Sequence, residues 1–242
     1  MVEANSRGVV WGIGAALRRL DPKSVVFYTS CRASLETSFM WQLLARMYGH
    51  NNLPDSSNMC HETTSVALKK FIGSPVGTCV LEDFDHCDLM LFFGQNTGSN
   101  SPRFLHPLQA AARRGCRIVT FNPVRERGLV EFTSPQNPAQ MTVTPPTTIS
   151  DLYLQVKPGG DVAALVGICK RVIEQDERND RQIIDYAFLE SHTTGYQDFA
   201  ARMKQISWDE IERTSGLRRA DLETVGDMYC QAEKTIGIYG MG

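Results

Sequence analysis

Four short runs of apolar residues alternate along the chain with longer stretches in which apolar positions recur at helical spacing. The runs span 24–29, 88–93, 117–121 and 235–239, and their composition is typical of strands buried on both faces of a parallel sheet. The repeated order strand, helix, strand predicts an α/β fold. We therefore expect a Rossmann-like, open, mostly parallel sheet flanked by helices.

Two of the intervening helices have recognisable ends. After the first run, apolar residues recur every four positions over 35–47, and Gly49 follows as a C-terminal cap. After the second run, Ser101 provides a cap and Pro102 the first helical position. From residue 160 onward, apolar stripes predict further helices that cover the sheet.

The stretch 123–158 differs from its surroundings, because four prolines between its ends interrupt it and it lacks a steady period. We expect it to form a long surface excursion at the edge of the sheet. The whole pattern predicts two parts: a partial α/β domain over residues 1–54 and a Rossmann-like domain over residues 55–242.

Composition narrows the class of protein. The 242 residues are 42% hydrophobic and 21% charged with a formal net charge of -2, which suits compact domains with a core and gives no broad electrostatic reason to bind nucleic acid or an anionic membrane. Apolar runs shorter than about 20 residues and a start without a signal segment predict a cytoplasmic protein. The chain ends directly after a predicted strand, so we expect it to be an internal piece of a larger protein. Its seven cysteines lack paired spacing, which favours reduced thiols.

In an open α/β sheet, ligands gather at the carboxyl ends of the strands. The residues that follow the four predicted strands include Arg32, the segments 94–99 and 122–127, and Gly240 with Met241. Glycine lets a ligand approach the backbone and arginine can hold a phosphate with two hydrogen bonds, so these segments favour a phosphorylated ligand over ordinary turns, which stay the alternative. The glycine patterns of dinucleotide-binding and P-loop proteins do not occur.

Cys60 lies in a polar loop that leads into an expected helix over 65–71, with His61 beside it. A cysteine at a helix N-terminus next to histidine is biased toward thiolate, the form that binds soft metals or attacks electrophiles. A buried structural cysteine is the alternative. A zinc site lacks the C-x-x-C pair, and a cysteine hydrolase using His61 lacks a local signature.

These segments resemble, in content and order, those of the molybdopterin oxidoreductases, above all the formate dehydrogenase alpha-subunit-like group. The resemblance covers nearly the whole chain. It is carried by Asn51-Asn52, Cys60-His61-Glu62, Phe93-Gly94-Gln95-Asn96, Phe121-Asn122-Pro123 with the following Glu126-Arg127-Gly128, Gly159-Gly160-Asp161 and Tyr239-Gly240-Met241-Gly242.

The resemblance implies a catalytic subunit that binds molybdenum through bis-molybdopterin guanine dinucleotide. Cys60 matches the side chain that ligates the metal, and His61 matches the histidine near a small substrate such as formate; the electron acceptor stays open. The residues implied as cofactor contacts are Arg32, Gly94, Asn96, Asn122, Arg125, Gly160, Gly240 and Met241.

The chain also departs from the family pattern. Asn122 stands where many relatives have an aspartate, and the chain lacks the amino-terminal cysteine-cluster domain and the carboxy-terminal capping domain expected of a complete enzyme. The spacing of its cysteines suits no iron-sulfur cluster, so such a cluster is expected only outside these residues. We expect the isolated chain to fold without activity. The alternative function is a non-catalytic α/β nucleotide-binding or protein-interaction module whose strand-end glycines serve architecture alone.

Overall fold

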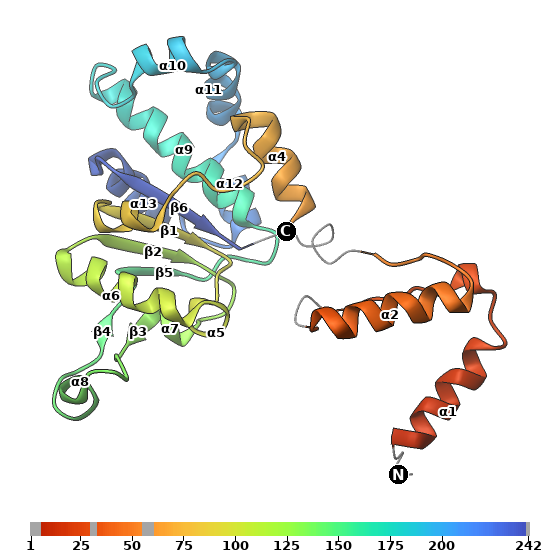
Figure 1. The fold of residues 1–242 in the computed structure, drawn as a ribbon. Coiled ribbons are helices and arrows are strands. Elements are labelled where there is room, and N and C mark those ends of the chain that lie inside the picture. The colour runs from red at the N-terminus through yellow and green to blue at the C-terminus, as the bar shows by residue number, and fades with distance from the viewer. Residues whose placement is uncertain (1–5, 30–32, 55–60, 241–242) are drawn as a thin grey trace. The chain divides into compact units, whose positions relative to one another are not determined.

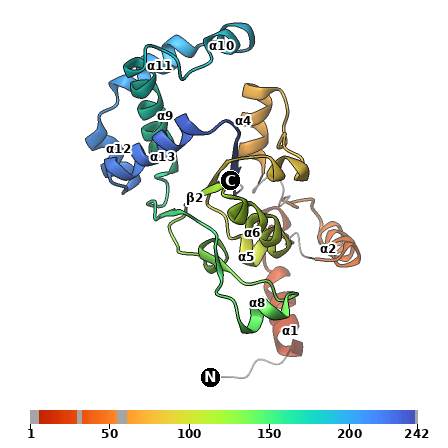
Figure 2. The ribbon, with the colours of Figure 1, turned by 90° about the vertical axis from the view of Figure 1, so that its left-hand side faces the viewer.

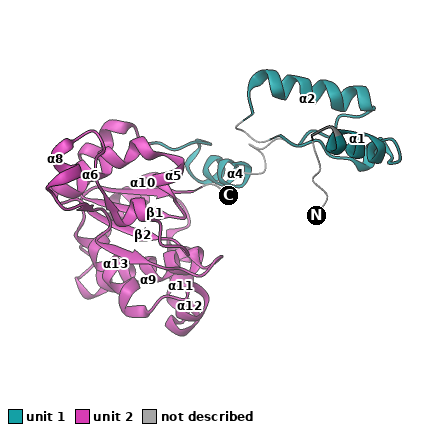
Figure 3. Cartoon of the chain, turned by 90° about the horizontal axis from the view of Figure 1, so that it is seen from below, with its two compact units in different colours: residues 1–78, 241–242 teal, residues 79–240 magenta. Residues whose placement is uncertain are grey.

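The computed structural model describes residues 6–29, 33–54 and 61–240, with side chains from residue 8 onward. They form two compact units, residues up to 78 and residues 79–240, and each unit is treated by itself (Figure 3). The domain boundary expected after residue 54 lies within the first unit.

The first unit is helical where it is described. Its elements are α1 (Ser6–Leu17), the 3-10 helix η1 (Pro22–Ser24), α2 (Leu35–Tyr48) and α4 (Glu62–Ile72). The helix expected over 35–47 is confirmed as α2. Ser34 accepts a hydrogen bond from the Thr37 amide at its start, and Gly49 ends it in the left-handed conformation, with φ of 116°.

The strand expected over 24–29 is wrong. Residues 25–29 belong to no strand, and the Phe27 amide donates instead to the Asn52 carbonyl at 3.0 Å. Phe27 is buried, whereas Val26 and Tyr28 are exposed. Among the residues described in this unit, no strand pairs with this segment. The apolar run alone could not reveal whether a partner strand exists.

The second unit is built on a four-stranded sheet with the order β5-β2-β1-β6, and all three strand pairs are parallel (Figure 1). The strands are β1 (Leu89–Phe93), β2 (Arg117–Phe121), β5 (Leu152–Leu154) and β6 (Thr235–Tyr239). Three of them confirm the predicted strands, and the sheet confirms the α/β class. The expected excursion over 123–158 supplies the edge strand β5 and a short antiparallel pair, β3 (Glu131–Phe132) with β4 (Thr147–Thr148).

Helices cover both faces of this sheet. The helices of this unit are η2 (Leu81–Asp85), α5 (Thr97–Asn100), η3 (Pro102–Phe104), α6 (Leu105–Arg114), α7 (Arg127–Val130), α8 (Pro138–Thr142), α9 (Asp161–Arg178), α10 (Tyr186–His192), α11 (Tyr196–Gln205), α12 (Trp208–Ser215) and α13 (Arg219–Gln231). In two views, α9 and α13 lie on one side of the sheet and α6 on the other (Figures 1 and 2).

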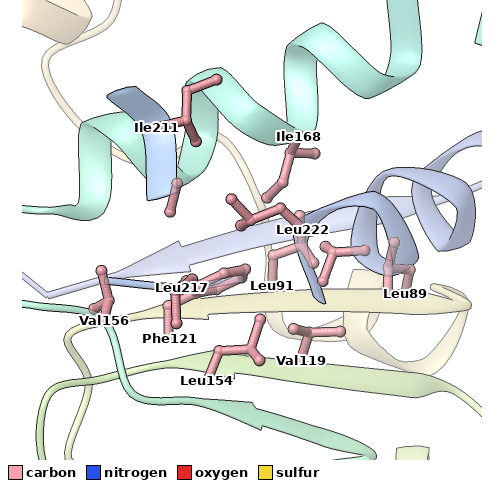
Figure 4. Packing of buried hydrophobic residues seen from close by; sticks show 12 residues of the cluster. Leu89, Leu91, Val119, Phe121, Leu154, Val156, Ile168, Ile211, Leu217 and Leu222 are labelled. Atoms are coloured by element: carbon pink, nitrogen blue, oxygen red, sulfur yellow. The ribbon is translucent and has the colours of Figure 1, made fainter. Parts of the chain in front are cut away.

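Alternate residues of the strands supply the two cores. Leu91 and Phe121 face α9 and α13, where they pack with Ile168 and Leu222 (Figure 4). The intervening residues, such as Phe92, pack on the α6 side. Burial of each such side chain stabilises the fold by about 1.5–3 kcal/mol, so both faces hold the strand register that positions the strand ends. Over the described ranges, we find no helix with both the length and the apolar character needed to cross a membrane.

Candidate functional site

The carboxyl ends of the four parallel strands lie at one edge of the sheet, here called the carboxyl edge. From β1 the strand order runs outward through β2 to β5, whereas β6 lies on the other side of β1. The link from β1 to β2 contains α6 on one face, and the link from β5 to β6 contains α9, α12 and α13, which cover the other face. The strand order therefore reverses between β1 and β6. In open α/β sheets, ligands bind at such a reversal.

Two glycines end the strands at this reversal. The Gly240 amide donates to the Phe93 carbonyl at 2.8 Å, and a Cβ on Gly240 would lie 2.7 Å from the carbonyl oxygen of Gly94. Gly94 has φ of 62°, and a Cβ there would meet no protein atom within 4 Å. Close backbone approach requires glycine at 240, whereas at 94 the left-handed conformation favours it and leaves open space in front of the chain.

The two predicted asparagines hold the loops of the carboxyl edge. Asn122 is 6% exposed, and its Nδ2 donates to the Gln95 carbonyl at 2.9 Å, which ties the end of β2 to the end of β1. The Asn96 side chain accepts from the Ser99 amide at 3.1 Å and so caps α5. The Asn122 side chain thus bonds to a neighbouring loop and the Asn96 side chain to its own turn, which gives both residues a structural role.

Arg125 is exposed in the loop after β2, with its guanidinium carbon 5.9 Å from the ring centroid of Tyr153. Tyr153, in β5, donates to the Val124 carbonyl at 2.9 Å and accepts from the Glu126 amide at 2.8 Å. Burial is the largest influence that raises the pKa of Tyr153, so its hydroxyl keeps its proton and continues to donate at neutral pH. The loop that carries Arg125 is thereby fixed to the edge strand.

Gly160 precedes α9 and packs against the end of α12. A Cβ on Gly160 would lie 2.9 Å from both the Ser215 Cα and the Thr214 carbonyl oxygen. The Gly160 amide donates to the Lys157 carbonyl at 2.8 Å. The structure thus gives Gly160 a packing role, and its contact with a cofactor stays a prediction.

A cleft of about 590 Å³ adjoins the carboxyl edge between the loops after β1 and β2. Its wall includes Asn96 and Ser99 from the first loop and Arg127 from the second. The loops touch through two glycines that sequence reasoning did not single out: a Cβ on Gly128 would lie 2.8 Å from the Gly98 Cα. Gly98 lies in the short helix α5 and Gly128 in the short helix α7, and their contact across 30 positions has no local signal in the sequence.

The predicted catalytic pair is only partly described. Cys60, Arg32 and Met241 lie outside the described residues. His61 is exposed directly before α4, in the first unit, and its side chain does not cap that helix. Within the described ranges, His, Cys, Asp and Glu side chains form no group of three suited to a metal ion. The metal and catalytic roles therefore stay predictions.

Residues 13–214 match the family profile described as molybdopterin oxidoreductase. The chain belongs to this family. Membership confirms the family predicted from the motifs, and it implies molybdenum and a pterin cofactor. Acetylene hydratase from Pelobacter acetylenicus has a similar fold, with a TM-score of 0.60 at 18% identity over 96% of this chain and 28% of that one.

Similar sequences extend beyond the matched region. Protein YdeP of Escherichia coli (strain K12) is 44% identical over 235 residues, covering 95% of this chain and 31% of that protein. An uncharacterized oxidoreductase of Mycobacterium tuberculosis is 37% identical over 231 residues, covering 95% and 30%. F420-dependent formate dehydrogenase 1 subunit alpha of Methanococcus maripaludis is 24% identical over 243 residues, covering 100% and 32%. The chain thus spans about a third of the length of these relatives.

Proposed function

We propose that this chain is a cofactor-binding part of a molybdenum-dependent oxidoreductase similar to formate dehydrogenase, and that its carboxyl edge contacts bis-molybdopterin guanine dinucleotide. The observation that carries the proposal is the reversal of strand order between β1 and β6, where Gly240 packs closely on Gly94 and Gly94 faces open space. The similarity to a formate dehydrogenase alpha subunit supports formate as the substrate.

The residues of the carboxyl edge fit a large phosphorylated group. Open space in front of Gly94 admits a ligand to the backbone, and the fixed loop after β2 presents the exposed guanidinium of Arg125, which would hold a phosphate. Because Asn96 and Asn122 are hydrogen-bonded to the loops, the edge is preorganised before a ligand arrives. In this proposal, Gly160 and Gly240 contribute backbone contacts and shape.

Chemistry would depend on the first unit. When bound, the cofactor supplies the two-electron oxidation-reduction. Cys60 would ligate the metal, and His61 would orient formate or take up a proton at an imidazole nitrogen. Arg32 and Met241 would add cofactor contacts.

Alanine at two left-handed glycines tests where the cofactor lies. Gly94 and Gly115 both have positive φ, and a Cβ at either would meet no protein atom within 4 Å, but Gly115 ends α6 just before the amino end of β2. Both substitutions put alanine at a positive φ, 62° at Gly94 and 93° at Gly115, and so carry backbone strain on the order of 1 kcal/mol, no smaller at Gly115. Only Gly94→Ala places a methyl group toward the proposed ligand. A steric cost of about 1–3 kcal/mol would weaken cofactor binding by roughly 5- to 150-fold.

The measurement is molybdenum and released guanine nucleotide per polypeptide in the full-length protein, with circular dichroism melting to compare the two variants. We expect Gly94→Ala to lose cofactor and Gly115→Ala to keep it. If Gly94→Ala and Gly115→Ala retain equal amounts of cofactor at similar stability, the cofactor does not lie against Gly94. A parent protein that contains zinc or no metal, and reduces no dye with formate, would instead favour the non-catalytic nucleotide-binding module.

A further inference from the structure

Two buried cysteines lie together at the amino ends of β1 and β2. The Sγ atoms of Cys87 and Cys116 are 3.8 Å apart, and the residues are 3% and 4% exposed. Both belong to the core on the α6 side of the sheet. The sequence places them 29 positions apart without any paired spacing, so only the fold brings them together.

The backbone fixes this pair in place. Cys87 comes two residues before β1 and Cys116 one residue before β2, and the Arg117 amide donates to the Asp88 carbonyl at 2.8 Å between them. Cys87 lies outside the regular strand, and its side chain packs beside Cys116 in the core on the α6 side, with the two sulfurs 3.8 Å apart. Side-chain rotation with a small backbone adjustment can bring them to the roughly 2.05 Å of a disulfide bond.

We propose that Cys87 and Cys116 form a two-electron redox site, in which hydrogen peroxide joins them in a disulfide that staples β1 to β2. One thiol loses its proton, and its sulfur attacks the peroxide; the S–O bond forms, the O–O bond breaks, and the departing hydroxide takes a proton. The second sulfur then attacks the sulfenic sulfur, so the S–S bond forms, the S–O bond breaks and water leaves. Two thiols and one peroxide give one disulfide and two waters.

The surroundings set the speed of this reaction. Burial is the largest influence on both thiols and raises the pKa of Cys87, and it raises the pKa of Cys116 to about 12. The guanidinium of Arg114, which donates to the Cys87 carbonyl at 2.8 Å, opposes that rise. The thiolate is therefore a minor form at neutral pH, and oxidation is slow there. Below the pKa, its rate should rise about tenfold for each pH unit.

The site is separate from the proposed cofactor chemistry. The cysteines lie at the amino ends of the strands, whereas Gly94 and Asn122 lie at the carboxyl ends of the same strands. A disulfide would thus constrain the frame of the sheet without entering the carboxyl edge. Its formation does not depend on a bound cofactor, so its test and the test of the proposed function can fail separately.

The experiment treats the reduced chain of 242 residues with hydrogen peroxide at about pH 7 and about pH 9, then alkylates the remaining thiols and maps the peptides by mass spectrometry. We expect one cross-linked peptide pair joining Cys87 to Cys116, formed faster at the higher pH and reversed by dithiothreitol. The oxidised chain should melt higher, by on the order of 10 °C, because the staple closes a loop of about 30 residues.

Two variants complete the test. Cys79→Ser changes an exposed thiol and should leave the cross-link and the rise in melting temperature unchanged. Cys116→Ala should abolish both, and a melting curve of the reduced variant verifies that it folds. The proposal is overturned if, in the unsubstituted protein, Cys87 and Cys116 are still alkylated separately after the exposed thiols have been oxidised. It is also overturned if either of them forms a disulfide with another cysteine.

Discussion

Replacing Asn122 by aspartate tests how the carboxyl edge is held together. The side chain keeps its shape, but a donor 2.9 Å from the Gln95 carbonyl oxygen becomes a second acceptor in a residue that is 6% exposed. An unpaired buried carbonyl costs about 1–3 kcal/mol. The buried carboxylate adds about 1.4 kcal/mol for each unit by which its pKa rises. We therefore expect Asn122→Asp to lower the free energy of unfolding by about 2–4 kcal/mol at neutral pH.

The pH dependence separates charge from shape. In Asn122→Asp, burial raises the pKa of the new carboxyl group above its value in the unfolded chain. The loss of stability is therefore full at pH values above the folded-state pKa, and it shrinks as the pH falls toward about 4. Once protonated, the carboxyl group can donate to the Gln95 carbonyl again.

Urea unfolding followed by circular dichroism at about pH 7 and about pH 4.5 measures both effects. Asn100→Asp is the matched control, because Asn100 is exposed at the end of α5 and should change stability by less than about 0.5 kcal/mol. If Asn122→Asp is as mild as this control at both pH values, the hydrogen bond to Gln95 does not hold the edge. A loss that is independent of pH would show that the carboxylate reaches solvent.

Three further substitutions or conditions probe the second unit. Gly128→Ala should cost about 1–3 kcal/mol in urea unfolding, and more than Gly98→Ala, since its Cβ would lie 2.8 Å from backbone whereas that of Gly98 would lie 3.3 Å away. Because its side chain is exposed, Arg125→Ala should change the free energy of unfolding by less than about 0.5 kcal/mol. It should nevertheless reduce molybdenum retention in the full-length protein, since the guanidinium is proposed to hold a phosphate. The hydrogen bond from Arg171 is the largest influence that lowers the pKa of Asp227. The stability contributed by this pair is therefore full above about pH 4 and is lost as the pH falls through the lowered pKa. Melting temperatures measured across an acid titration, for the parent and for Asp227→Asn, test this loss.

The sheet was predictable where a strand is a run of mainly apolar residues. β1 and β2 are almost wholly buried and β6, at the edge of the sheet, is only partly buried, but all three are such runs and were identified from the sequence. β5 has only three residues inside a proline-rich stretch, and its place at the edge depends on pairing Val119 with Leu152, which no local pattern reveals. The wrong strand over 24–29 is the converse case, because strand-like residues formed no ladder.

The sequence predicted where the loops of the carboxyl edge meet, but it did not predict what each residue in them contacts. Glycine and asparagine after strands indicated where the loops would meet, since parallel strands end at one edge. The roles depend on contacts between distant segments. Gly160 packs against Ser215, and Asn122 bonds to Gln95, so residues that looked like ligand contacts have protein partners. No local pattern reveals the contact between Gly98 and Gly128.

These partners change how specificity can arise at the carboxyl edge. Asn96 and Asn122 hold loops, and Tyr153 fixes the loop after β2, so the protein itself sets the geometry of the edge. For a ligand, this leaves bare backbone at Gly94 and the exposed cation of Arg125. In the proposed site, recognition by backbone shape and one exposed charge would select for size and phosphate more than for a particular base. Substitution of a loop-holding residue should therefore lower stability and cofactor retention together, whereas Arg125→Ala should separate them.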